Sequence, residues 1–315
     1  GPSCPAMRPR SDWFVVVNPA SGSGRSLRSW RALEAALGVE GLTFEAVVTR
    51  HAGDGEDAAT AAVRRGFRRL LAVGGDGTLH EVLNGALAVP GVDSRELVLA
   101  VAPFGTGNDW ARGRGVPREA LALARCLTAG RTARCDVGII EFTGTPAAPH
   151  RHFINVAGAG IDAEVLAALP RGPARRSAYL LGVLRALWSF RPPEFTLHAD
   201  AREERGARLV ALAANGAYCG NGMRLAPGAV ADDGLLDIVT VEPLPLLAAL
   251  RRLPRLFDGR LAGERWVRSS RTACLEMRAN PAATIEADGQ IVGTTPARLR
   301  VLPGAIQVLD CAPPA

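Results

Sequence analysis

The chain has 315 residues, of which 48% are hydrophobic and 22% charged, values typical of a soluble globular protein of about two domains. The formal net charge is +6, and all 37 basic residues are arginine, because the sequence contains no lysine. This composition excludes mechanisms that depend on lysine, such as the P-loop phosphate contact, the Schiff base and the nucleotide-binding lysine of protein kinases.

The first half of the chain alternates short β-rich runs with longer stretches of helical periodicity, which predicts a parallel sheet covered by helices. Strands are expected over residues 14–17, 43–49, 69–73 and 97–102, and helices over 26–37, 57–65 and 79–87. Glycine-rich segments follow the strands at 18–25, 74–78 and 103–109. Glycines therefore gather where strands end.

After about residue 134 the pattern changes to alternating apolar and polar runs separated by Gly, Pro and Asn turns, which is typical of an antiparallel sheet. The expected strands cover 151–156, 195–199, 208–214, 236–241, 274–278, 283–286, 297–302 and 306–309. Two predicted helices rich in Leu and Arg, over 177–190 and 244–257, interrupt them. We therefore predict two domains, residues 8–134 and residues 135–300.

The cysteines show neither a CxxC motif nor a Cys/His spacing typical of metal ligands. They are Cys4, Cys126, Cys135, Cys219, Cys274 and Cys311. Because a two-domain chain of this size does not need disulfides, we expect free thiols in a reducing compartment. No segment reaches the roughly 18 uninterrupted apolar residues of a membrane span.

The segment 18–25 lies between the first predicted strand and helix, where backbone N–H groups and the helix dipole favour an anion. Its candidate phosphate contacts are Asn18, Ser21, Gly22, Gly24 and Arg25. It is not a Rossmann fingerprint, because Leu27 stands where a third glycine is needed, and it lacks the lysine of a P-loop. A flexible strand-to-helix turn is the alternative interpretation.

The segment 74–78 combines three glycines with an acidic residue. Gly74, Gly75 and Gly77 would let the backbone approach a polyphosphate closely, while Asp76 supplies a carboxylate beside it. That carboxylate could orient Mg²⁺ or accept the proton of an attacking hydroxyl, and phosphoryl transfer uses both. The alternative is that Asp76 is a turn or N-cap residue.

These segments belong to a longer series of motifs. The series is Asn18-Pro19-x-Ser21-Gly22, Gly74-Gly75-Asp76-Gly77-Thr78 with Glu81-Val82-x-Asn84-Gly85, and Pro103-x-Gly105-Thr106-Gly107-Asn108-Asp109. In order and spacing it resembles the catalytic domain of the diacylglycerol kinase family of lipid kinases, and in length the soluble bacterial branch. Further matches at Asn155, 160–163, Asn215, 220–222, Pro227 and 233–237 extend the resemblance over nearly the whole chain.

The resemblance implies an N-terminal α/β domain similar to phosphofructokinases and NAD kinases and a C-terminal β-sandwich, with ATP in the cleft between them. It also implies that a last strand, about 301–312, returns to the first domain. The residues that would contact ATP are Thr49, Gly74, Gly75, Asp76, Gly77, Thr78, Leu79, His80 and Thr106. Asp76 would lie next to the transferred phosphate, and Asp109 would join the charge network around it.

A structural Mg²⁺ is also implied, at the Asp-Gly-Leu loop. Its ligands would be the side chain of Asp233 and the backbone carbonyls of Val230 and Leu235. Mg²⁺ takes few carboxylates and keeps several waters, which such a loop can satisfy. A plain turn between strands is the alternative, and a second Mg²⁺ would accompany ATP.

The chain departs from the family pattern at Gln290, which stands in place of the glutamate proposed as general base toward the lipid hydroxyl. An amide cannot accept that proton, and general base catalysis is typically worth about 10²–10⁴-fold. Either Asp76 acts as the base, Asp288 reaches the hydroxyl directly, or Gln290 orients the acceptor; we favour Asp76. The pair Asp288-Gly289 is also a type I′ hairpin signal.

The sequence thus predicts an ATP-dependent lipid kinase that phosphorylates a lipid hydroxyl, with diacylglycerol, giving phosphatidic acid, as the leading substrate. A sphingosine or ceramide kinase, a catalytically weak pseudokinase that binds lipid or nucleotide, and an NAD kinase are the alternatives.

The arginine-rich helices over 177–190 and 244–257 would bind the anionic inner face of the cytoplasmic membrane, or would simply pack on the sandwich. A nucleic-acid partner is not expected, because aromatic residues make up only 5% of the chain. A homodimer is left open.

Overall fold

The structure is a computed structural model that describes residues 12–144, 148–161, 189–252 and 254–311. The chain divides into two compact units. Unit 1 contains Gly1–Cys135 and Gly304–Ala315, and unit 2 contains Asp136–Pro303. The helix predicted over 177–190 lies outside the described residues except for its last two positions. Asp162 and Ala163 of the motif series also lie outside the described residues.

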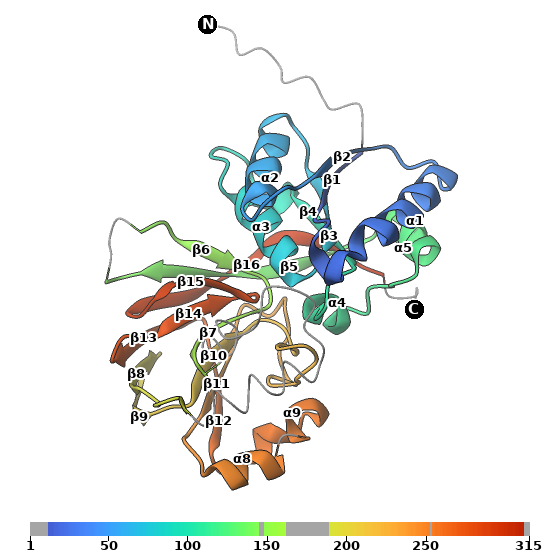
Figure 1. Cartoon of the computed structure of the whole chain (residues 1–315). Coiled ribbons are helices and arrows are strands. Elements are labelled where there is room, and N and C mark those ends of the chain that lie inside the picture. The colour runs from blue at the N-terminus through green and yellow to red at the C-terminus, as the bar shows by residue number, and fades with distance from the viewer. Residues whose placement is uncertain (1–11, 145–147, 162–188, 253, 312–315) are drawn as a thin grey trace, which may run out of the picture. The chain divides into compact units, whose positions relative to one another are not determined.

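Unit 1 is built on a parallel sheet with the strand order β2-β1-β3-β4-β16 (Figure 1). Its strands are β1 (Trp13–Val17), β2 (Phe44–Val48), β3 (Arg69–Gly74), β4 (Val98–Pro103) and the second half of β16 (Ala297–Leu309). Every residue of β1 and β4 is buried, because helices cover both faces of the sheet. This burial explains why these strands appear in the sequence as uninterrupted hydrophobic runs.

The helices of unit 1 form a layer on each side of its sheet (Figure 1). They are α1 (Ser26–Val39), α2 (Asp54–Arg64), α3 (Asp76–Leu87), α4 (Asp109–Gly113) and α5 (Ala120–Ala129), with the short 3₁₀ turns η1 (Ser21–Gly24) and η2 (Ser94–Glu96). Leu33 of α1 and Leu127 of α5 share a core with Val15 and Val17 of β1. On the other side α2 and α3 pack so closely that a Cβ at Gly85 would lie 2.1 Å from the carbonyl oxygen of Glu56.

Unit 2 consists of two sheets packed face to face, which together with unit 1 confirms the predicted class of an α/β domain followed by a β-sandwich. One sheet has the order β12-β11-β10-β7-β14-β15, and the other contains β13, β8 and β9 beside the first half of β16, with β5 and β6. Their bounds are β5 (Thr132–Phe142), β6 (Arg151–Phe153), β7 (Val156–Gly160), β8 (Glu194–Ala199), β9 (Arg202–Ala207), β10 (Val210–Ala214), β11 (Leu236–Val241), β12 (Val267–Thr272), β13 (Cys274–Asn280), β14 (Thr284–Ala287) and β15 (Gln290–Thr294). Phe195, Leu275 and Met277 of one sheet share a core with Ala213 and Ile238 of the other.

The last strand, β16, belongs to both units. Residues 297–300 pair with β13 of unit 2, and residues 307–308 pair with β4 of unit 1. The sequence predicts two separate strands here, because Pro303-Gly304 is a turn signal. In the structure Gly304 has a φ of 54°, which bends the strand as it passes from one unit to the other without ending it.

The predicted helix over 244–257 is two short helices, α8 (Leu246–Arg252) and α9 (Arg255–Asp258), followed by the 3₁₀ turn η3 (Arg260–Gly263). The break comes at Pro254, which cannot donate a backbone hydrogen bond to the preceding turn.

A disulfide joins Cys126 of α5 to Cys311, which follows β16, so the expectation of free thiols at all six cysteines is wrong. The two residues are 185 positions apart in the sequence, and their Cα atoms are 5.5 Å apart. The return of β16 to unit 1 brings them together, and no local spacing could reveal it. The other described cysteines, Cys135, Cys219 and Cys274, remain thiols.

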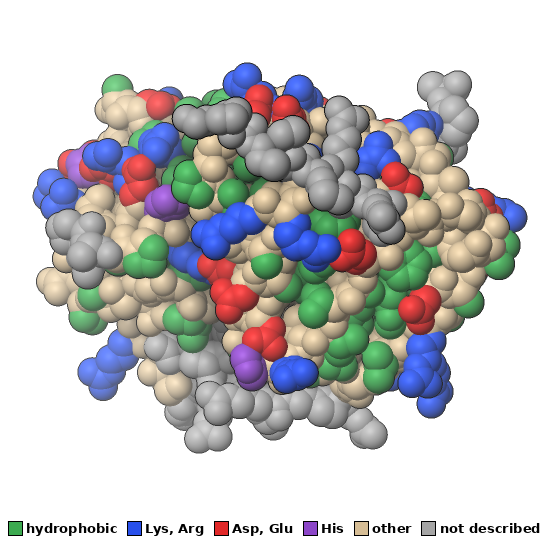
Figure 2. Space-filling view, turned by 90° about the horizontal axis from the view of Figure 1, so that it is seen from above, with side chains coloured by type: hydrophobic (Ala, Val, Ile, Leu, Met, Phe, Trp, Pro, Cys, Tyr) green, Lys and Arg blue, Asp and Glu red, His purple; other side chains and the backbone are tan. Residues whose placement is uncertain are grey.

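Arginine side chains lie among acidic ones on the face shown in Figure 2 and do not gather there into one continuous basic patch. Ion pairs hold several arginines of the described residues: Arg65 is 2.6 Å from Glu45, and Arg300 is 2.7 Å from Glu141. The hydrogen bond from Arg300 lowers the pKa of the Glu141 carboxyl below its ordinary value. Much of the positive charge is therefore balanced locally.

Candidate functional site

Three loops meet at the carboxyl edge of the unit 1 sheet, where β1, β3 and β4 end. Because the three strands are parallel, their C-terminal loops lie at the same edge, the usual place for a ligand in an open α/β sheet. The Asn18 side chain of the first loop donates a hydrogen bond to the Thr78 hydroxyl at 3.1 Å. The backbone N–H groups of Phe104 and Gly105 both donate to the carbonyl oxygen of Gly74, at 2.9 Å each.

The glycines of these loops are required where one backbone packs against another. A Cβ at Gly105 would lie 2.3 Å from the Cα of Gly75, and a Cβ at Gly22 would lie 2.2 Å from the carbonyl oxygen of Phe104. Gly22 also has a φ of 58°, a conformation that glycine adopts at no steric cost. These glycines therefore allow the loops to pack against one another, in addition to the close approach to phosphate that the sequence predicts.

The Asp76 carboxylate connects two of the loops. Asp76 is the first residue of α3, and its two side-chain oxygens accept hydrogen bonds from the backbone N–H groups of Asp109 (3.0 Å) and Trp110 (3.1 Å), the first residues of α4. Helix N-termini favour a negative charge. Asp76 is therefore held in one orientation and stays partly exposed, which is compatible with a chemical role. The N-cap of α3 is Gly75, so the alternative in which Asp76 is the N-cap is wrong.

Asp109 is buried, with 5% of its surface exposed, and one of its oxygens is 3.8 Å from Nε of Arg112. The residue before it, Asn108, has a φ of 53°, and its side chain forms two hydrogen bonds to the backbone of the same loop. Its side chain accepts from the N–H of Gly105 at 2.9 Å and donates to the carbonyl of Gly105 at 2.8 Å. The loop that carries Asp109 is thus internally braced.

The remaining predicted nucleotide contacts range from buried to exposed, with Ser21 and Gly77 partly buried. The side chains of Leu79 and His80 are buried within α3, and Thr49 is buried with its hydroxyl donating to the carbonyl of Val17 at 3.3 Å. Thr106 is exposed, and so is Arg25, whose Nε donates to the carbonyl of Gly22 at 3.0 Å. The exposed set is better placed to meet a ligand.

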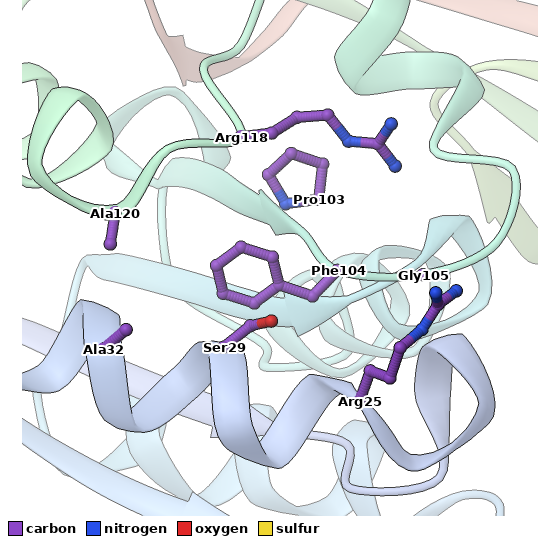
Figure 3. A pocket seen from close by; sticks show the side chains of 8 residues that line it. All are labelled: Arg25, Ser29, Ala32, Pro103, Phe104, Gly105, Arg118 and Ala120. Atoms are coloured by element: carbon purple, nitrogen blue, oxygen red, sulfur yellow. The ribbon is translucent and has the colours of Figure 1, made fainter.

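A pocket of about 530 Å³ opens beside these loops, between α1 and the segment that leads into α5 (Figure 3). Its lining residues are Arg25, Ser29, Ala32, Pro103, Phe104, Gly105, Arg118 and Ala120. Arg118 lies outside every motif of the sequence, so no pattern singles it out. The absence of lysine was the only available signal, since it requires arginine to supply any cationic contact to phosphate.

In unit 2, Asp288 and Gly289 form the turn between β14 and β15, with φ values of 49° and 83°, as the hairpin signal indicates. The buried Asp288 carboxylate accepts from the backbone N–H groups of Ile154 (3.0 Å), Asn155 (2.9 Å) and Val156 (3.2 Å). These contacts give it a structural role, and the alternative in which Asp288 acts directly on the acceptor loses support. Gln290 is partly buried at the start of β15.

The residues proposed for a structural Mg²⁺ do not fit that ion in this arrangement. One oxygen of Asp233 accepts from the N–H of Leu235 at 3.0 Å, and the other pairs with the guanidinium of Arg271. Arg271 also lies 3.4 Å from Asp237, whose pKa is raised above its ordinary value by burial. Val230 is half exposed. In the parts of the chain that the structure describes, no group of three or more His, Cys, Asp and Glu side chains could hold a metal ion.

Comparisons with known proteins agree with the fold and with the motifs. Residues 12–140 match the family described as the diacylglycerol kinase catalytic domain, and residues 155–310 match the YegS C-terminal NAD kinase beta sandwich-like domain. A crystal structure of a diacylglycerol kinase from Bacillus anthracis has a TM-score of 0.71 and 20% identity, over 96% of this chain and 98% of that chain, and shows the same fold.

Sequence relatives cover most of the chain. A YegS-like lipid kinase of Chromohalobacter salexigens is 29% identical over 300 residues, 94% of this chain and 92% of the relative. A diacylglycerol kinase of Mycobacterium tuberculosis is 31% identical over 299 residues, 94% of each protein. The chain therefore belongs to the diacylglycerol kinase family of lipid kinases.

Proposed function

We propose that this protein transfers the γ-phosphate of MgATP to a lipid hydroxyl, with diacylglycerol as the acceptor and phosphatidic acid as the product. The observation that carries the proposal is the convergence of the 18–25, 74–78 and 103–109 loops around the Asp76 carboxylate, in a member of a lipid kinase family. The N-terminus of α3, which begins at Asp76, favours bound phosphate.

The proposed chemistry assigns the proton to Asp76. The lipid oxygen attacks the γ-phosphorus as its proton passes to the Asp76 carboxylate, and the bond from phosphorus to the ADP oxygen breaks. Its two oxygens accept the backbone N–H groups of Asp109 and Trp110, which orient the carboxylate for that role. Phosphoryl transfer depends mainly on positioning and on stabilising charge. The Asp76 carboxylate is positioned by two N–H groups. It could therefore take the role of the glutamate that Gln290 replaces.

The test is an assay with radiolabelled ATP and mixed micelles of diacylglycerol, ceramide or sphingosine, with NAD as a soluble acceptor. We expect phosphatidic acid as the main product and a loss of about 10²–10⁴-fold in kcat for Asp76→Asn. Asp93→Asn, which changes another capping carboxylate of unit 1, is the matched control and should keep its activity. A faster turnover of ceramide, sphingosine or NAD would replace diacylglycerol as the substrate.

Gln290 favours a second candidate, a nucleotide- or lipid-binding protein without kinase activity, because the amide cannot act as a base. ATP binding without any product would support that candidate. The Gln290→Glu variant tests whether Asp76 or the side chain at position 290 supplies the general base. If this variant turns over at the wild-type rate and Asp76→Asn does too, neither residue supplies the base and the proposed assignment is wrong.

We also propose that the region of α8 and α9 contacts an anionic membrane at its cytoplasmic face. Phe257 of α9 is 53% exposed, which makes it available for insertion. Arg252 and Arg255 both pair with Glu264, so apolar contact rather than their charge would have to provide much of the binding. Within the described ranges, no helix has the length and apolar character to cross a bilayer.

Sedimentation with vesicles of phosphatidylcholine and phosphatidylglycerol tests this contact. Phe257→Ser should reduce the bound fraction several-fold, while Val39→Ser, at another exposed apolar position, should not. Equal sedimentation of both variants and the wild type would remove α9 as a docking element.

A further inference from the structure

The pocket between α1 and the segment before α5 contains two guanidinium groups that have no acidic partner in the described parts of the chain. In Figure 3 the side chains of Arg25 and Arg118 come from opposite sides of the pocket, and both guanidinium groups lie toward the end where Gly105 is found. The rings of Phe104 and Pro103 lie away from that end and give the pocket an apolar surface. The pocket thus combines an apolar surface with a cationic end.

Neither arginine forms an ion pair with a carboxylate among the described residues. Arg25 donates only to the backbone carbonyl of Gly22, at 3.0 Å. The neighbour of Arg118, Glu119, directs its carboxylate to the backbone N–H groups at the start of α5. Arg125, on the same helix, instead has Glu40 as its partner. The two pocket arginines are therefore available to an anionic ligand.

The other surroundings of the pocket favour an anion as well. Helix α1 begins next to Arg25 with no side-chain cap and no acidic residue in its first turn, and Ser29 of α1 adds a hydroxyl to the lining. Gly105, at the cationic end, is the residue that packs against Gly75 of the 74–78 loop. The pocket is therefore continuous with the loops proposed to hold the nucleotide.

We propose that Arg25 and Arg118 form a clamp for a phosphate group, with Phe104 in contact with the organic part of the same molecule. A guanidinium binds phosphate through paired, charge-assisted hydrogen bonds, and in a chain without lysine arginine is the only side chain with a permanent positive charge. The inference rests on the proposed function for the source of that phosphate, which is the polyphosphate of the donor nucleotide or the head group of the phosphorylated lipid.

Isothermal titration with two probes separates these sources: the Mg²⁺ complex of a non-hydrolysable ATP analogue, and dihexanoyl phosphatidate below its micelle concentration. Arg118→Gln and Arg25→Gln should each raise the Kd of one probe roughly 10- to 100-fold. Arg28→Gln, which removes the same charge from an exposed position of α1 outside the pocket, should change neither Kd more than about twofold.

A rise confined to the ATP analogue identifies the nucleotide polyphosphate, and a rise confined to phosphatidate identifies the lipid phosphate. In the double variant Arg25→Gln with Arg118→Gln, the combined loss should differ from the product of the single losses, because both groups hold one phosphate. If Arg118→Gln leaves both Kd values unchanged, the clamp is refuted. A wild-type protein that binds a probe with this arginine dependence but phosphorylates no acceptor would refute the proposed function and leave the clamp standing.

Discussion

Replacing Asp288 with alanine should lower the stability of unit 2. It should leave the kcat of the folded enzyme nearly unchanged. The buried carboxylate accepts three backbone hydrogen bonds from 154–156. A hydrogen bond to a charged group contributes about 1.5–3 kcal/mol, and bonds to one acceptor are not additive, so we expect a loss of about 3–5 kcal/mol in the free energy of unfolding. Unit 2 spans Asp136–Pro303, and for a domain of that size the fall in Tm should be about 10 °C.

The assay combines differential scanning calorimetry with kcat measured well below the lower Tm, so that the variant is fully folded. Asp288→Asn, which keeps one acceptor oxygen, should lose about half as much stability. Asp232→Ala, at an exposed position of the same unit, is the control and should leave Tm unchanged. If Asp288→Ala keeps the wild-type Tm and loses 100-fold or more in kcat, Asp288 is the base and the structural argument fails.

Three further changes test other features. Cys126→Ser opens a disulfide that closes a loop of 185 residues and should lower the free energy of unfolding by up to about 5 kcal/mol; a wild-type Tm insensitive to reducing agent would contradict this. Gly105→Ala places a Cβ 2.3 Å from the facing loop and should weaken binding of the ATP analogue roughly 10-fold or more, unlike Gly38→Ala, where a Cβ meets nothing within 4 Å. Arg271→Met should lower the free energy of unfolding by about 1 kcal/mol. Excess Mg²⁺ should not shift the wild-type Tm, and a rise in Tm with Mg²⁺ would support the metal site at the Asp-Gly-Leu loop.

The parallel sheet of unit 1 could be predicted because its strands are buried on both faces and appear as continuous hydrophobic runs. Strand β11 was predicted with its observed bounds for a similar reason, since it lies inside its sheet. Strands β9 and β12 were missed because each lies at the edge of a sheet and is rich in exposed polar residues. Edge strands lack the apolar alternation on which sequence prediction depends.

The candidate site was predictable only as far as contiguous motifs reach. Asp76 was identified from the glycines around it, but its hydrogen bonds to α4 depend on a loop 33 positions further along the chain. The pairing of Arg271 with Asp233 spans 38 positions, so nothing in the Asp-Gly-Leu motif could indicate that an arginine supplies the cation. The position of Arg118 on the pocket likewise follows from the packing of α1 near α5.

Because β16 pairs with strands of both units, it affects how the chain can fold during translation. Strand β4 is synthesised roughly 200 residues before the segment that pairs with it, so during translation the edge of β4 has no partner. Leu309 completes a core whose other residues emerge from the ribosome long before. The sheet of unit 1 therefore cannot be completed until nearly the whole chain has been synthesised, and an expression fragment that stops at residue 135 should aggregate rather than fold.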